Sequence, residues 1–221
     1  MKNQTFVTKA LFRQNLWFLI PYVLLLLMAS FFLIQEEKGA MVKVFNEGAH
    51  PVFDWFFVFF THVGDGIFGA VLCLILLFFN RKEALVMAVA LILAGVLSQL
   101  LKQTLGADAS RPSVYFEGVL QFRDIAFLER RGHFSMPSGH TTSAFCMFMI
   151  LTLFAEKKSY GYVFVILATL VGISRIYLAQ HFLDDVVAGS FLGVITAIFV
   201  FTLMGPRLKA PHWNQPLFKR S

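Results

Sequence analysis

The sequence predicts an all-α protein, a six-span transmembrane helical bundle that forms a single domain over residues 1–221. Three observations lead to this prediction. Hydrophobic residues make up 57% of the chain and charged residues only 14%, which departs from the composition of soluble domains. The hydrophobic residues fall into long runs, close to the about 20 residues that cross a bilayer as a helix. Basic and polar residues separate these runs, as in connections between spans.

The first expected span covers 15–34 and follows a basic N-terminal segment. A cleaved signal peptide is the alternative, but the run is long for one and lacks a clean cleavage site of small residues. We expect 35–50 to be a polar loop. The aromatic stretch 51–61 is long enough only to lie along the membrane surface or to begin the next span.

Five further spans are expected along the rest of the chain, at 65–79, 84–101, 138–154, 160–177 and 185–204. A long polar connection, 106–135, separates the third span from the fourth, and loops of this length in compact proteins are usually either functional or disordered. Several basic side chains in it are expected to form a solvated basic loop in preference to contacting a headgroup: Arg123, Arg130, Arg131 and His133.

The distribution of charge places both termini in the cytoplasm. Six spans put the two ends on one side, together with eleven of the 19 Lys and Arg residues: Lys2, Lys9, Arg13, Arg81, Lys82, Lys157, Lys158, Arg207, Lys209, Lys219 and Arg220. Cytoplasmic loops carry an excess of such residues. The net charge of +6 is scattered in short clusters, which fits membrane orientation better than nucleic-acid binding. We expect an integral protein of a bacterial inner membrane.

Polar residues from three distant segments should then meet at the opposite, periplasmic face. They are Lys102, Arg111, Ser138, Gly139, His140, Arg175, His181 and Asp185. Ionisable groups at the edge of a span are expensive to keep and mark a functional site. Three cations and two imidazoles with one dedicated carboxylate indicate a phosphate site, and the start of a helix at Ser138 adds backbone N–H donors.

The two histidines have different expected roles. His181 and Asp185 are four residues apart, so on a helix they share one face and Asp185 can orient the imidazole. We expect His181 to attack phosphorus and His140 to protonate the departing oxygen, with a phosphohistidine as intermediate.

No metal or other cofactor is expected. The acidic residues near these motifs are only Asp184 and Asp185, too few for a metal site. Cys73 and Cys146 lie inside apolar runs without metal-ligand or disulfide spacing.

These residues resemble the three-part signature of the type 2 phosphatidic acid phosphatase superfamily, which includes membrane lipid phosphatases, glucose-6-phosphatase, bacterial acid phosphatases and vanadium haloperoxidases. The resemblance covers about 102–185. The matching parts are Lys102 with Arg111-Pro112, the PSGH segment 137–140, and Ser174-Arg175 with His181 and Asp185. Eight residues, 103–110, separate Lys102 from Arg111, where the family pattern has six.

The resemblance implies a role for each matched position. Lys102, Arg111 and Arg175 would bind phosphate, Ser138 and Gly139 would assist through hydrogen bonds, His140 would be the general acid, His181 the nucleophile and Asp185 its partner. The implied protein is a membrane lipid phosphatase whose substrate is a lipid phosphomonoester or pyrophosphate. Undecaprenyl pyrophosphate, phosphatidylglycerol phosphate, phosphatidic acid and a lipid A phosphate all fit.

Three alternatives remain open from the sequence. The first alternative is a phosphotransferase, which would pass the phosphate to a second lipid. It differs from a hydrolase only in the acceptor of the phosphate. A transporter would carry charges through the depth of the bilayer and repeated halves, whereas here the charges cluster at one face and no repeat is visible. A haloperoxidase is the third and most remote alternative. Membrane lipids are the expected partners, and the sequence identifies no protein partner.

Overall fold

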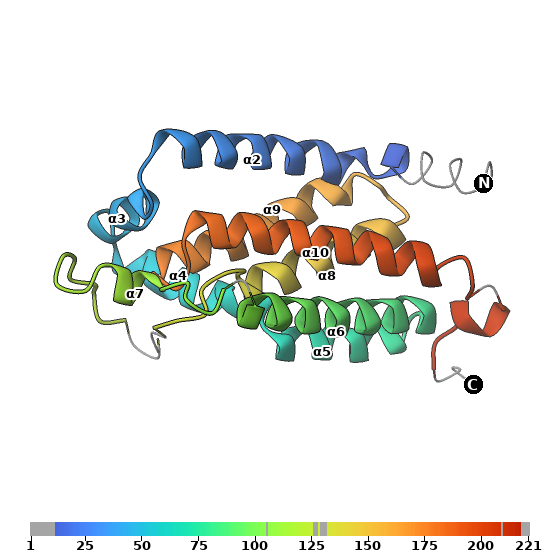
Figure 1. The fold of residues 1–221 in the computed structure, drawn as a ribbon. Helices are drawn as coiled ribbons and strands as arrows, with labels where there is room; N and C mark the ends of the chain where they lie inside the picture. Colours follow the sequence, from blue (N-terminus) through green and yellow to red (C-terminus); the bar gives the residue numbers. More distant parts are fainter. Residues whose placement is uncertain (1–11, 105, 126–127, 129–131, 209, 218–221) are drawn as a thin grey trace.

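A computed structural model describes residues 12–104, 106–125, 128, 132–208 and 210–217, and all regular structure in these ranges is helical. Six helices lie side by side in one bundle (Figure 1): α2 (Leu16–Gln35), α5 (Gly66–Leu77), α6 (Arg81–Thr104), α8 (Gly139–Phe154), α9 (Tyr160–Tyr177) and α10 (Leu183–Met204). The shorter helices α3 (Ala40–Glu47), α4 (Pro51–Thr61) and α7 (Pro112–Tyr115) gather at one end of it. The described ranges also contain two 3₁₀ turns, η1 (His62–Gly64) and η2 (Pro211–Asn214). The all-α prediction is confirmed.

Four of these helices, α2, α6, α9 and α10, are long and apolar enough to cross a membrane. The pair Pro51–Gly64 and Gly66–Leu77 passes the same test together, with a bend of 57°, and so gives a fifth candidate. Helix α8 is apolar but has only 16 residues. The aromatic stretch 51–61 therefore leads into the next apolar helix, one of the two arrangements expected for it.

Two expectations about the connections were wrong. The expected polar loop 35–50 contains helix α3, because Val42 packs into a second apolar cluster that includes Phe116 and Phe182. Arg123, expected to be solvated, pairs with the Asp54 carboxylate at 3.0 Å and so ties the long connection to α4. Five residues used in the charge argument lie outside the described residues: Lys2, Lys9, Lys209, Lys219 and Arg220. So do Arg130 and Arg131 of the expected solvated basic loop.

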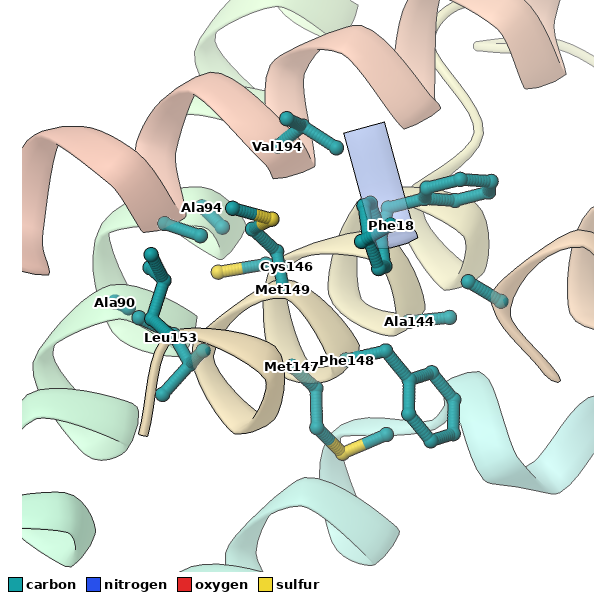
Figure 2. Close-up of a cluster of buried hydrophobic side chains, with 14 of the residues drawn as sticks. Phe18, Ala90, Ala94, Ala144, Cys146, Met147, Phe148, Met149, Leu153 and Val194 are labelled. Atoms are coloured by element: carbon teal, nitrogen blue, oxygen red, sulfur yellow. The ribbon is translucent and has the colours of Figure 1, made fainter. Parts of the chain in front are cut away.

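Helix α8 forms the centre of the core. In Figure 2 its side chains Cys146 and Met149 lie between Ala90 and Ala94 of α6 and Val194 of α10, all of them buried. Small side chains on α6 leave room for the larger ones on α8, so the two helices pack closely. Most of α8 is therefore shielded from lipid by its neighbours, although its composition is that of a membrane helix.

Close approach of α8 and α10 depends on two glycines of α10. A Cβ atom on Gly189 would lie 2.6 Å from the Ser138 carbonyl oxygen, and one on Gly193 would overlap the Thr142 carbonyl. Only glycine fits such contacts. The close packing brings the start of α8 against the start of α10, where the Ser138 N–H donates to the Asp185 carbonyl at 3.0 Å.

The helix directions bring the predicted site residues to one end of the bundle. Helix α2 begins and α10 ends at the end opposite to α3, α4 and α7 (Figure 1). Lys102 lies in the last turn of α6, Ser138 caps the start of α8, and Asp185 lies in the first turn of α10. Residues that are far apart in sequence therefore become neighbours.

Candidate active site

A tight turn after α9 places Arg175 and His181 next to each other. The N–H groups of Gln180 and His181 both donate to the Arg175 carbonyl, at 2.9 and 3.1 Å. Ala179 has a φ of 52°, in the left-handed region that often ends helices. The turn fixes the backbone of His181, whose side chain is only 2% exposed.

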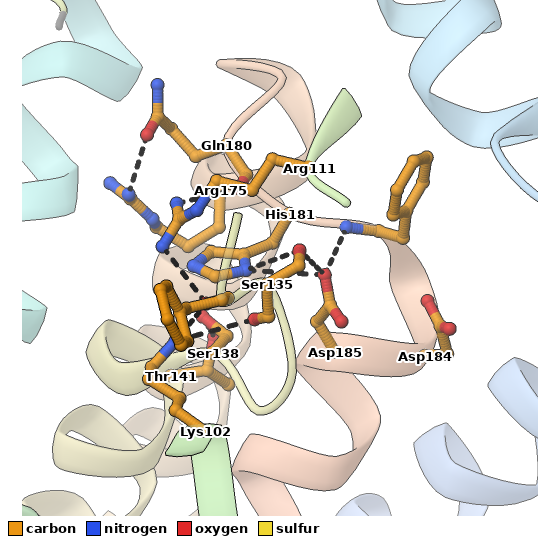
Figure 3. A network of polar contacts seen from close by, with 12 residues as sticks. Lys102, Arg111, Ser135, Ser138, Thr141, Arg175, Gln180, His181, Asp184 and Asp185 are labelled. Carbon is orange, nitrogen blue, oxygen red and sulfur yellow. Dashed lines mark hydrogen bonds and ion pairs between the residues drawn. The ribbon is translucent and has the colours of Figure 1, made fainter. Parts of the chain in front are cut away.

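One carboxylate oxygen organises the histidine. Oδ2 of Asp185 accepts hydrogen bonds from Ser135 Oγ at 2.5 Å and from the Phe182 N–H at 2.9 Å, and it lies 3.3 Å from His181 Nδ1 (Figure 3). The contact predicted from the four-residue spacing of His181 and Asp185 is therefore present. A neutral imidazole that donates through Nδ1 keeps an unprotonated Nε2, the form a nucleophile needs.

The electrostatic surroundings keep His181 neutral. Burial, followed by the positive charges of Arg175, Arg111 and Lys102, lowers its pKa well below the ordinary value of 6.5. Burial disfavours the charged form of an imidazole, and nearby cations add to this effect. The same interactions indicate that all three predicted cations surround the ring.

Lys102 and Arg111 meet at one backbone carbonyl. The Phe134 oxygen accepts from Lys102 Nζ at 2.7 Å and from Arg111 Nη2 at 3.5 Å. Arg111 also donates to the carbonyls of His133 and Gln180, each at 3.0 Å. The eight-residue spacing between the two cations therefore leaves both of them at the same place, and both are at least nine-tenths buried.

Arg175 is held by partners from two directions. Its Nη1 donates to Thr61 Oγ1 of α4 at 2.7 Å, and its Nη2 donates to the Gln180 side-chain oxygen at 3.5 Å. The residue is 7% exposed, so its charge acts in a poorly solvated environment. A fixed and desolvated guanidinium is suited to binding a phosphoryl group.

The start of α8 supplies backbone donors. Ser138 is fully buried at the N-cap, and its hydroxyl accepts from Thr141 Oγ1 at 2.9 Å. The Thr142 N–H bonds to the Ser138 carbonyl, whereas the amides of Gly139 and His140 belong to the first turn, where a helix offers no carbonyl partner. His140 interacts electrostatically with both Arg175 and His181, so it belongs to the same site.

The structure thus brings together all eight residues that the sequence indicated. It adds three that sequence reasoning missed, namely Thr61, Ser135 and Gln180. The sequence carried a weak signal for two of them, since Ser135 lies three residues before Ser138 and Gln180 directly precedes His181. Asp184 turns away from the site, and its carboxylate lies 3.4 Å from Lys38 Nζ.

The arrangement has the donors of an anion site and few metal ligands. Within the described ranges, no group of three or more His, Cys, Asp or Glu side chains is placed to hold a metal ion. Cationic side chains, helix N–H groups and a buried neutral imidazole instead lie close together at one end of the bundle. Such a set of donors can bind a phosphoryl group and stabilise the negative charge on its oxygens.

Comparison with known proteins agrees with this chemistry. The model of the PAP2 superfamily matches residues 83–209. Phosphatidylglycerophosphatase B of Bacillus subtilis is 32% identical over 63% of this chain and 70% of its own length. Lipid A 4'-phosphatase of Porphyromonas gingivalis is 25% identical over 77% of this chain and 73% of its own length.

A solved structure extends the likeness to the fold. The crystal structure of a transmembrane PAP2-type phosphatidylglycerolphosphate phosphatase from Bacillus subtilis superposes with a TM-score of 0.63. It is 26% identical, and the match covers 87% of this chain and 98% of that one. The likeness therefore includes most of the bundle and is not restricted to the motifs.

Proposed function

Because the chain belongs to the PAP2 superfamily of phosphatases, we propose that it removes phosphate from a membrane lipid through a phosphohistidine on His181. The observation that carries this proposal is the state of His181. The ring is buried, its Nδ1 faces Asp185, and three cations surround it, as expected of a neutral nucleophile that meets an anionic substrate.

We assign the steps as follows. Nε2 of His181 attacks phosphorus, so an N–P bond forms while the bond from phosphorus to the lipid oxygen breaks. His140 donates a proton to that departing oxygen. Water then attacks the phosphohistidine, His140 takes a proton from the water, and the N–P bond breaks to release inorganic phosphate. This sequence restores both histidines.

The remaining residues would bind the phosphoryl group and stabilise its negative charge. Lys102, Arg111 and Arg175 would hold the nonbridging oxygens, with Ser138 and the Gly139 amide as further donors. Ser135, which donates to Asp185, would fix the carboxylate that orients His181. Cationic side chains and backbone donors can supply this stabilisation without a metal ion, so the proposed mechanism uses none.

A lipid substrate fits the surface around the site. Apolar side chains of α4 and η1 line a wide and open groove of about 490 Å³ on the surface: Val52, Trp55, Phe56, Phe59, Phe60 and Val63. Thr61, which binds Arg175, lies between two of these residues in sequence. An acyl or prenyl chain in this groove would stay in lipid while its phosphate reaches the cations.

We further propose a six-span topology in a single domain over 1–221, in which the bent α4–α5 pair counts as one span and the short α8 as another. Both termini would lie in the cytoplasm and the site at the periplasmic face of a bacterial inner membrane. Helix α2 begins and helix α10 ends at the same end of the bundle, which supports an even number of spans. In this topology eleven of the 19 Lys and Arg residues of the sequence belong to segments on the side of the termini, which supports a cytoplasmic position for that side.

Trapping the intermediate tests this proposal. The purified protein, in detergent, is mixed with ³²P-labelled phosphatidylglycerol phosphate, phosphatidic acid, undecaprenyl pyrophosphate or a lipid A phosphate, and quenched in base, where phosphohistidine survives. We expect label on the wild type with at least one substrate, none on His181→Ala, and unchanged label on His212→Ala, a histidine at the opposite end of the bundle. Label on His181→Ala would contradict the nucleophile assignment.

The same assay distinguishes hydrolysis from phosphotransfer and tests the need for metal. Release of one inorganic phosphate for each lipid consumed, without an added acceptor lipid, is expected of a hydrolase. Activity should persist in EDTA. Loss of activity in EDTA that a divalent ion restores would contradict the metal-free mechanism.

A further inference from the structure

Ser98 is a buried hydroxyl that the roles assigned above do not use. It lies on α6, one helical turn before Lys102, and its side chain is 3% exposed. Its Oγ has no hydrogen-bond partner among the described residues. Some other buried hydroxyls in the bundle bond back along their own helices, as Thr152 does to the Phe148 carbonyl at 2.8 Å. A buried hydroxyl normally has a hydrogen-bond partner. The lack of one among the described residues at Ser98 indicates that its partner is not part of the protein.

The hydroxyl points to the first turn of α8. A Cβ atom built on Gly139 would lie 3.9 Å from Ser98 Oγ. Apart from the helix backbone of Gly139 and its chain neighbours, no other described atom comes within 4 Å of that position. An open space therefore lies beside Gly139, and the Ser98 hydroxyl borders it.

This space has donors on several sides. The amides of the first turn of α8 face outward from the helix start. Lys102, four residues after Ser98, is on the same face of α6 and lowers the pKa of His181 through its charge. An oxygen atom in this space would accept from the helix start and from Ser98 at the same time.

We propose that Ser98 donates a hydrogen bond to a nonbridging phosphoryl oxygen of the substrate and of the phosphohistidine, and is therefore a further phosphate-binding residue. The proposal rests on the proposed function, since it takes the phosphoryl group to lie at the start of α8. The partner that Ser98 Oγ lacks among the described residues would then be an oxyanion, which is a stronger acceptor than a helix carbonyl that is already bonded.

Inorganic phosphate and orthovanadate serve as probes of the site without the lipid. Ser98→Ala should weaken inhibition by both about tenfold and lower kcat/KM for the lipid substrate by a similar factor, as for a lost hydrogen bond to a charged group. Ser98→Thr keeps the hydroxyl and should restore part of the binding. Ser30→Ala, on the lipid-exposed face of α2, is the matched control and should behave as wild type.

Thermal unfolding separates binding from a structural role. Without ligand, Ser98→Ala should melt at or above the wild-type temperature, because the lost hydroxyl had no protein partner. The increase in melting temperature that phosphate produces in the wild type should shrink in the variant. A lower melting temperature with unchanged phosphate and vanadate affinity would overturn the proposal.

The two proposals fail in different ways. If Ser98→Ala leaves phosphate and vanadate affinity unchanged while His181→Ala cannot be labelled, the role of Ser98 is wrong and the phosphohistidine mechanism stands. If the wild type hydrolyses no lipid phosphate, the proposed function fails. The effect of Ser98→Ala on phosphate-induced stabilisation then still decides whether Ser98 binds the anion.

Discussion

The hydroxyl of Ser135 lies 2.5 Å from Oδ2 of Asp185, closer to that oxygen than His181 Nδ1, which lies 3.3 Å away. Ser135 Oγ also lies 3.4 Å from the same ring nitrogen. One serine from the long connection therefore contacts both members of the pair that the third motif supplies. Ser135 therefore acts as a positioning residue, because it contacts both His181 and the Asp185 carboxylate that orients it.

Ser135→Ala is expected to lower kcat about tenfold with little change in KM. Removal of a hydrogen bond to a charged group costs about 1.5–3 kcal/mol, of which only the part that orients His181 appears in the rate. Ser135→Thr retains the hydroxyl and should recover most of the activity. Steady-state kinetics of the three proteins checks this, and an unchanged kcat in Ser135→Ala would refute the positioning role.

Arg175→Lys should lower kcat/KM about 30- to 150-fold, equivalent to about 2–3 kcal/mol. A lysine keeps the charge but cannot contact Thr61, Gln180 and a phosphoryl group with one planar fork. The matched control is Arg207→Lys, an exposed arginine after the end of α10. Equal kinetics for the two variants would show that charge alone matters at position 175.

Acidification should destabilise the wild type more than His181→Asn. The pKa of His181 is lowered in the folded protein, so below about pH 6.5 the unfolded chain binds a proton there that the folded chain does not. Stability is therefore lost as pH falls from 6.5, by at most about 1.4 kcal/mol for each pH unit. Melting temperatures at pH 7.5 and 5.5 in detergent test this. A larger decrease in melting temperature for His181→Asn than for the wild type would have the opposite sign and contradict the prediction.

Gly193→Ala should destabilise the bundle by about 1–3 kcal/mol and lower activity with it, because the new methyl group meets backbone atoms of α8, including the Cys146 nitrogen at 2.9 Å. Gly95→Ala is the control. Apart from its chain neighbours and the backbone of its own helix, no described atom lies within 4 Å of its Cβ position, so the variant should be neutral or stabilise the helix by up to about 1 kcal/mol. Thermal unfolding of both variants measures the difference.

The sequence predicted the helical class and the contacts that depend on local spacing. The four-residue step from His181 to Asp185 predicts a contact within one turn, and Pro137-Ser138 predicts a helix start, which lies at Gly139. Hydrophobic run length predicted the positions of the long helices, because lipid imposes that length on the chain.

Contacts over long distances in sequence were not predictable. Thr61 is 114 residues from Arg175 and lies at the end of an aromatic stretch, with no local pattern that indicates a polar partner. Helix α3 was missed because Val42 in this polar segment joins the apolar cluster that includes Phe116 only after the chain folds. Arg123 likewise finds Asp54 only in the tertiary structure.

The single Phe134 carbonyl that accepts from both Lys102 and Arg111 has a consequence for motif searches. The fold places Lys102 and Arg111 at the same carbonyl, and the number of residues in the loop between them can vary. Patterns that require a fixed count between the first two cations would overlook chains such as this one. A tolerant gap anchored by the PSGH segment would retain them.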